Sequence, residues 1–126
     1  MKQTQLKRGT KELRKTKIKY QSGKQKVMQH NFRKLCYYLI QNRANEQCEI
    51  RGENCINQNL WGHHIIKRSK LRDDSARNII IGCNRCHDHT TYPDYGIPIT
   101  PENAQQIVDK ANKKYNISPF LIGEEL

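Results

Sequence analysis

The clearest hydrophobic pattern in the chain is helical and runs over residues 24–43. Cys36 lies within this pattern and has no cysteine near it in sequence, so it is predicted to be a core thiol rather than a metal ligand. Residues 42–46 are expected to leave the helix. The apolar side chains recur every three or four positions, as on the buried face of an amphipathic helix: Val27, Met28, Phe32, Leu35, Cys36, Leu39 and Ile40.

A second helix is predicted to begin near residue 100. Thr100 suits the N-cap, Pro101 the first helical position and Glu102 the positive end of the helix dipole. The final "ISPFLIGEEL" contains apolar residues that could pack on the fold or dock a partner. The expected buried stripe of this helix consists of Ala104, Ile107, Val108, Ala111 and Tyr115.

Between the two helices the apolar runs are short and β-branched. Ile65–Ile66 and Ile79–Ile81 are predicted strands, and the polar "KRSKLRDDSAR" between them is predicted to be a loop. A short helix is expected after Cys86, and any regular element must then break at Pro93, Gly96 and Pro98. The pattern predicts an α+β domain over residues 25–126.

The composition indicates that this domain needs a staple. Only 35% of the 126 residues are hydrophobic and nine are aromatic, so the core is small. No signal peptide is visible, and no apolar run approaches the roughly 20 residues of a membrane span. We therefore expect a cytoplasmic protein with no membrane partner. In such a reducing compartment, cysteines more often bind metal than form disulfides.

The positive charge is concentrated at one end of the chain. Residues 1–35 carry twelve Lys and Arg and one acid, whereas residues 36–126 carry eleven of each kind, out of a net charge of +11. A basic arm over residues 1–24 is predicted to be flexible until it meets nucleic acid, although a solubilising tail is the alternative. The arm residues expected to contact phosphates are Lys7, Arg8, Lys11, Arg14 and Lys15.

The cysteines after residue 47 form two local pairs. Cys83 and Cys86 have the Cys-x2-Cys spacing that lets two thiolates face one tetrahedral ion. Cys48 and Cys55 are farther apart, but Gly52 could make the turn between them. Together they predict a structural four-cysteine site with each sulfur about 2.3 Å from Zn²⁺. A reduced core without metal is one alternative, and a site of three cysteines with His87 is the other.

Three histidines lie among these cysteines. His63 and His64 are adjacent on what looks like a strand, so their side chains should point to opposite faces. One is therefore expected to bind metal while the other acts unligated. His87 follows Cys86 directly, so that a zinc site would hold it rigidly and let it complete the second metal site.

The order "GHHII", Asn78 and "CNRCH" resembles the motif of the His-Asn-His (HNH) nuclease family over about residues 48–91. The flanking cysteine pairs resemble the zinc-bound members that are common in phages and mobile elements. The resemblance implies a ββα-metal core stapled by zinc and flanked by the two helices. It also implies hydrolysis of DNA phosphodiester bonds.

The resemblance further implies a role for each motif residue. His64 would be the general base, His63 and His87 would hold a catalytic divalent ion, and Asn78 would hold the loop that positions the base. Many family members have another ligand one helical turn after the last motif histidine. Thr91 stands there in this chain and is a poor ligand. The ion could be Mg²⁺, Mn²⁺, Ni²⁺ or Zn²⁺.

Residues beside the motif have two interpretations each. Lys67, Arg68 and Arg77 could clamp phosphates or lie on a solvated loop, and Trp61 could line the groove or pack in the core. Three functions remain in view: an HNH endonuclease, a catalytically silent zinc-ribbon protein that binds DNA, and an RNA-binding zinc protein. A second copy of the chain and other phage proteins are further candidate partners.

Overall fold

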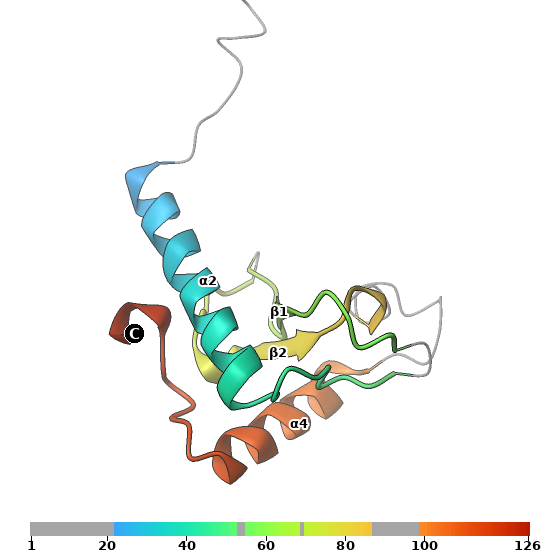
Figure 1. Ribbon diagram of the computed structural model, residues 1–126. Coiled ribbons are helices and arrows are strands. Elements are labelled where there is room, and N and C mark those ends of the chain that lie inside the picture. Colours follow the sequence, from blue (N-terminus) through green and yellow to red (C-terminus); the bar gives the residue numbers. More distant parts are fainter. Residues whose placement is uncertain (1–21, 53–54, 69, 87–98) are drawn as a thin grey trace, which may run out of the picture.

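The computed structural model describes residues 22–52, 55–68, 70–86 and 99–126. Two long helices and a two-stranded antiparallel sheet make up a small α+β fold (Figure 1). No helix in these ranges combines the length and apolar character needed to cross a bilayer. The elements in chain order are α2 (Gly23–Asn42), β1 (Trp61–His64), η1 (Ala76–Asn78), β2 (Ile79–Gly82), α4 (Pro101–Lys114) and η3 (Gly123–Glu125).

Helix α2 confirms the predicted amphipathic helix. It begins with a capping box in which the Gln25 backbone N–H donates to Ser22 Oγ and the Ser22 backbone N–H donates to the Gln25 side chain, both at 3.1 Å. Its buried residues include Cys36, which is a core thiol as predicted. The prediction was wrong for Val27, which is 59% exposed because the first turns of α2 extend beyond the sheet (Figure 1).

The sheet is one hairpin, and its first strand lies earlier than predicted. His63 pairs with Ile80 and His64 with Ile79, and β1 ends there. Ile65 and Ile66 were expected to form the strand. The Ile65 N–H donates to the Asn78 backbone carbonyl at 2.9 Å, which continues the register of the hairpin by one position, but the Ile66 N–H donates to the Asn78 side chain at 2.8 Å. The chain therefore leaves the hairpin at Ile66.

The second strand is buried on both faces, and this places the hairpin between the two helices. Ile79 and Ile81 pack in the core cluster with α2, whereas Ile80 packs with the cysteines and with Ala104 and Val108 of α4. Figure 1 shows α2 and α4 on opposite sides of the sheet. The α2 layer lies close, because a Cβ at Gly62 would overlap Cys36 Sγ. Only glycine fits at that position.

Helix α4 begins as predicted, with the Asn103 N–H donating to Thr100 Oγ1 at 3.2 Å and Pro101 in the first turn. Its buried stripe differs from the prediction at the end of the helix. Tyr115 is 36% exposed, and Asn112 is buried in its place. Asn112 is buried because the guanidinium of Arg43 lies in the core and needs a hydrogen-bond acceptor from α4.

Arg43 is buried directly after α2, where only an exit from the helix was expected. Its Nε and Nη2 each donate to a carboxylate oxygen of Glu49 at 2.8 Å, and its Nη1 donates to Asn112 Oδ1 at 2.9 Å. Nη1 and Nη2 also donate to the backbone carbonyls of Ala76 and Ile79. All five N–H groups of the guanidinium are thus used, and one side chain joins both helices to the hairpin.

The C-terminal segment packs on the fold. The Ala76 N–H donates to the Leu121 carbonyl at 2.9 Å, and the Arg77 N–H donates to the Pro119 carbonyl at 2.8 Å. Gly123 lies against α2, where a Cβ would overlap the backbone carbonyl of Asn31. Figure 1 shows this end of the chain beside α2. The segment therefore braces η1, which precedes the second strand.

Candidate metal centre and active site

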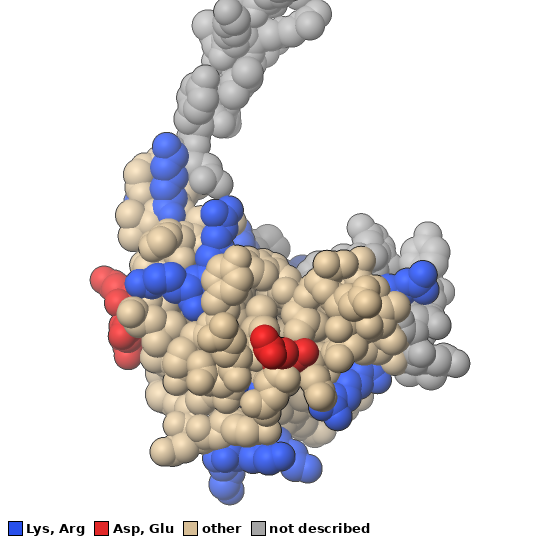
Figure 2. Space-filling model, in the orientation of Figure 1, with Lys and Arg blue, Asp and Glu red and all other residues tan. Residues whose placement is uncertain are grey.

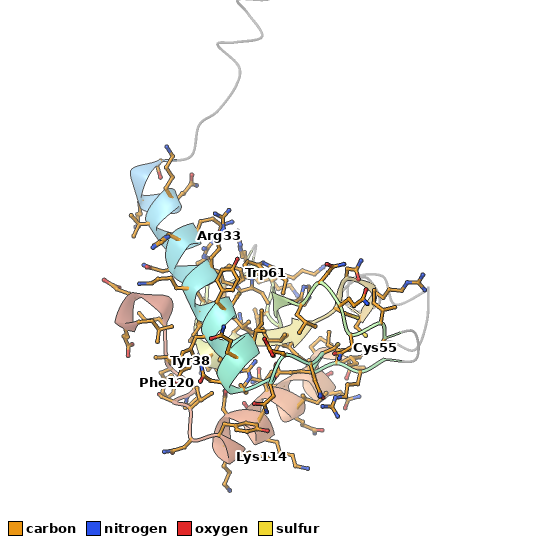
Figure 3. The ribbon with its side chains drawn as sticks, in the orientation of Figure 1. Arg33, Tyr38, Cys55, Trp61, Lys114 and Phe120 are labelled. Atoms are coloured by element: carbon orange, nitrogen blue, oxygen red, sulfur yellow. The ribbon has the colours of Figure 1, made fainter. Side chains whose placement is uncertain are left out.

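The four cysteines of the two local pairs converge on one point. The sulfur atoms of Cys48, Cys55, Cys83 and Cys86 all lie within 4.8 Å of one another. Tetrahedral bonds of about 2.3 Å to one zinc would separate the sulfurs by about 3.8 Å. Cys83 Sγ lies 3.8 Å from Cys55 Sγ. The donor set and its spacing therefore fit a metal ion such as zinc. Figure 3 labels Cys55.

Backbone amides point at these sulfurs. The Gly52 N–H donates to Cys86 Sγ and the Cys83 N–H donates to Cys48 Sγ, both at 3.3 Å. Such bonds favour the thiolate form that metal binding requires. Gly52 was expected to make the turn between Cys48 and Cys55, but the residue with a left-handed backbone conformation is Arg51, with φ of 52°. Gly52 serves instead through its N–H.

The charges in the cysteine cluster call for a cation. Burial raises the pKa of Cys86, and it also raises the pKa of Cys55. Burial acts in the same direction on Cys83, but backbone N–H donors from Cys86 and Ile56 outweigh it and lower the pKa of Cys83 to about 6. Four thiolates this close repel one another, so a divalent cation among them would hold all four in the charged form.

The hairpin register pairs the two adjacent histidines with residues whose side chains pack on opposite faces of the sheet. His64 shares the α2 face with its partner Ile79, and its ring stacks on Phe32 with centroids 4.8 Å apart and planes 13° apart. The Nε2 atom of His64 lies 2.7 Å from Asp74 Oδ1. His63 lies opposite Ile80, whose side chain packs among the cysteines.

Both histidines border a cavity of about 350 Å³ at the open edge of the hairpin. The α2 wall carries Gln29, Phe32 and Arg33, and the rest comes from Trp61, Gly62, His63, His64 and Arg68. Figure 3 shows Arg33 and Trp61 on the same side of α2. Trp61 was expected either to line a groove or to pack in the core, and it does both. It lines this cavity and also packs partly on the core beside Tyr37.

Asn78 is buried and braces the loop between the strands. Its Oδ1 accepts from the Ile66 N–H at 2.8 Å, and its Nδ2 donates to the carbonyls of Ile66 at 3.2 Å and Asp73 at 2.8 Å. One side chain thus holds both ends of the segment 66–73. Asp74, the partner of His64, follows this segment directly. Asn78 therefore fixes the backbone beside the His64 ring.

The basic residues of the loop divide into two groups. Arg68 lines the cavity, and its guanidinium lies 5.5 Å from the Phe32 ring centroid. Arg77 is turned elsewhere: its Nε donates to Asp73 Oδ2 at 3.1 Å and its guanidinium lies over Phe120. Lys67 is exposed and does not border the cavity. The expectation that all three act on neighbouring phosphates thus keeps geometric support only at Arg68.

Several predicted site residues lie outside the described ranges. His87, the expected second ligand of a catalytic ion, is one of them, as is Thr91. The arm residues Lys7, Arg8, Lys11, Arg14 and Lys15 also lie outside. Within the described part, Figure 2 shows Lys and Arg gathered along the first half of α2 and again at the lower end of the molecule, where Figure 3 labels Lys114 of α4.

Three residues at the site were missed in the sequence. Asp74 and Arg72 belong to a polar run that reads as an ordinary loop, and nothing in their spacing links them to His64. Arg33 was recoverable in part, since it stands one position after Phe32 and four after Gln29 on the helix, beside the face that meets the hairpin. Its partner surface is set only by the packing of α2 on β1.

Comparison with known proteins adds no relative: no family model, curated protein or solved structure matches this chain.

Proposed function

We propose that the protein is a metal-dependent endonuclease of the HNH type that hydrolyses phosphodiester bonds in DNA. The observation that carries the proposal is the cavity at the hairpin edge. Both histidines, Arg33 and Arg68 are among the residues that line this one open site. A binding surface for phosphate needs the cations, but it has no need of a histidine whose second ring nitrogen is held by a carboxylate.

His64 suits the role of general base. An imidazole accepts a proton readily near neutral pH, and its ring is held by Phe32 and by Asp74. In the proposed step a water oxygen forms a bond to phosphorus and its proton passes to His64. The bond from phosphorus to the sugar oxygen breaks, and that oxygen leaves with the electron pair and takes a proton from solvent water. Arg33 and Arg68 would hold the non-bridging phosphate oxygens.

His63 would contribute to binding a divalent ion, together with His87 beyond the described residues. His63 fits this role because it leaves the strand on the face of Ile80, toward the cysteine cluster that precedes residue 87 in the chain. When bound, Mg²⁺, Mn²⁺, Ni²⁺ or Zn²⁺ would supply positive charge to the phosphate and the leaving oxygen. The cysteine cluster would hold a structural zinc.

A second function has an observation in its favour. The ring of His64 is stacked on Phe32 and its side chain is only 10% exposed, which is also how a purely structural histidine packs. Under this alternative the chain is a catalytically silent zinc-ribbon protein that binds DNA through its cations. The Arg-lined cavity serves that function equally well, so only a catalytic measurement separates the two.

The test is a nicking assay on supercoiled plasmid with each of the four divalent ions, and with excess EDTA as the control. We expect cutting that depends on the added ion and is lost in His64→Ala, while that variant keeps its zinc and its fold, as shown by metal analysis and circular dichroism. His30→Ala is the matched control, because His30 is exposed on α2. A His64→Ala chain that cuts as fast as wild type would leave the DNA-binding function.

A further inference from the structure

We propose that Asp74 is a positioning residue that fixes the tautomer of His64, so that Nδ1 is the ring atom that accepts the proton. The inference rests on the proposed function for its consequence in catalysis, but its structural half can be measured without any cutting. It concerns the Asp74 carboxylate, the Arg72 guanidinium and the His64 ring.

The first step is the contact between the acid and the ring. His64 Nε2 lies 2.7 Å from Asp74 Oδ1, and a carboxylate can only accept. Nε2 must therefore carry the hydrogen in the neutral ring. The lone pair is then on Nδ1, the nitrogen that Asp74 does not occupy.

The second step is that the other carboxylate oxygen is already committed. Arg72 donates from Nε to Asp74 Oδ2 at 2.8 Å, and its Nη2 lies at the same distance from that oxygen. The carboxylate is thus held in one orientation, with Oδ2 toward the guanidinium and Oδ1 toward the imidazole.

The third step is that the ring cannot easily turn to exchange its nitrogens. Phe32 stacks on it at 4.8 Å, and the side chain is 10% exposed. The backbone that carries the acid is held as well, since Asn78 Nδ2 donates to the Asp73 carbonyl at 2.8 Å. Both partners of the 2.7 Å contact are therefore fixed by packing and hydrogen bonds.

These contacts predict that the conservative substitution is worse than the truncation. In Asp74→Asn, Arg72 selects the amide oxygen for the Oδ2 position, which leaves the NH2 group facing His64 Nε2. Nε2 must then accept, so the hydrogen moves to Nδ1 and the base is lost. In Asp74→Ala, neither tautomer is imposed, so a fraction of the molecules keeps a basic Nδ1.

The activity test compares these variants on plasmid. We expect Asp74→Asn to lose about 100-fold or more in rate, within the range that a general base contributes, as the equivalent change in a Ser-His-Asp triad does through the wrong tautomer. Asp74→Ala should be at least about tenfold faster than Asp74→Asn. Asp109→Asn, an exposed position on α4, is the matched isosteric control and should cut as wild type does.

A double-mutant cycle isolates the part played by Arg72. On an Arg72→Ala background the amide introduced by Asp74→Asn is free to flip and offer its oxygen to Nε2. Asp74→Asn should therefore cost much less there than on the wild-type background. Equal losses on both backgrounds would show that Arg72 does not set the orientation, and would overturn this part of the inference.

The tautomer itself is read from ¹⁵N shifts of the ring nitrogens in zinc-loaded chain, with the His64 signals assigned by their loss in His64→Gln. The inference expects hydrogen on Nε2 in wild type and on Nδ1 in Asp74→Asn. Hydrogen on Nδ1 in wild type, or no change in the variant, overturns it. If the tautomers behave as expected but wild type never cuts DNA, the inference about Asp74 stands and the proposed nuclease function fails.

Discussion

Asn78 and Ile66 form a two-way pair: the Ile66 N–H donates to Asn78 Oδ1 at 2.8 Å, and Asn78 Nδ2 donates to the Ile66 carbonyl at 3.2 Å. The same Nδ2 donates to the Asp73 carbonyl. The side chain thus acts as a backbone substitute that ends β1 and closes the loop after it. Because Asn78 is buried, its removal leaves partly buried backbone groups of Ile66 and Asp73 without their hydrogen-bond partner.

We therefore predict that Asn78→Ala lowers the free energy of unfolding by about 1–3 kcal/mol, the usual cost of leaving buried polar groups unpaired. Asn78→Asp should be at least as harmful, since its carboxylate would face two carbonyl oxygens where the amide donated. Urea unfolding with metal analysis measures both effects, and zinc content should stay unchanged. A variant as stable as wild type would show that the loop holds its place without Asn78.

The helices were predictable because their signals are local. The 3.6-residue period of α2 and the cap at Thr100 lie within a few residues of sequence, and both were recovered. The errors arose where distant groups compete. Ile65 and Ile66 look like a strand, but the Asn78 side chain takes the Ile66 amide and ends the pairing. Val27 has the right spacing, but no part of the described fold covers the first turns of α2.

The candidate site shows the same division. The cysteine cluster could be predicted because the spacing of metal ligands is visible in the sequence, and the four sulfurs do converge. Asp74 could not be predicted as the partner of His64, since the contact joins a strand to a loop whose path Asn78 decides. Arg43 carried no signal either: an arginine after a helix is usually solvated, and its burial depends on Glu49 and Asn112.

Arg43 supports the second prediction. Its guanidinium is buried and bonded to Glu49 and to three other groups, so Arg43→Met leaves the Glu49 carboxylate without its charge partner inside the protein. We expect a loss of about 3–5 kcal/mol in the free energy of unfolding. The matched control is Arg77→Met, because Arg77 is 49% exposed in its ion pair with Asp73 and should cost less than about 1 kcal/mol.

Restoring charge balance sharpens this test. In the double variant Arg43→Met, Glu49→Gln, no unpaired charge remains, so part of the loss should be recovered. Chemical unfolding of the four chains completes the cycle. A double variant no more stable than Arg43→Met alone would mean that the lost hydrogen bonds to Asn112 and the backbone carry the effect instead of the Glu49 charge.

The third prediction concerns the cysteine cluster. We expect one tightly held zinc per chain, bound by Cys48, Cys55, Cys83 and Cys86. Cys48→Ser or Cys83→Ser should lose the zinc and much of the fold, because a small core depends on the ion. Cys36→Ala should keep full zinc content, since Cys36 packs under Gly62 in the other core cluster. Metal analysis with circular dichroism tests all three variants, and zinc loss in Cys36→Ala would contradict the assignment.

The fourth prediction uses Trp61, the one tryptophan in the sequence and a wall of the candidate cavity. DNA that enters the cavity should change the fluorescence of Trp61. Titrations with the His64→Ala chain, which is not expected to cut, would give the affinity at several salt concentrations. Arg68→Ala should weaken binding and reduce the slope of log affinity against log salt by about 0.9, since each phosphate contact releases counterions.

Lys113→Ala is the control for that titration, because Lys113 is exposed on α4 and does not line the cavity. It should leave both the fluorescence change and the salt slope near those of the parent chain. If Lys113→Ala and Arg68→Ala weaken binding equally, DNA is held by overall charge and the cavity has no special part in binding.

The fifth prediction concerns the basic arm, and the structure indicates at which residue a deletion of the arm should end. Ser22 caps α2, so deletion should stop at residue 21 to keep the capping box. A milder change replaces Lys7, Arg8, Lys11, Arg14 and Lys15 with glutamine. If these five residues contact phosphates of duplex DNA, the salt slope should fall by up to about 4.5, while thermal unfolding and zinc content stay unchanged. An unchanged slope would make the arm a solubilising tail, and DNA binding would then depend on the folded part alone.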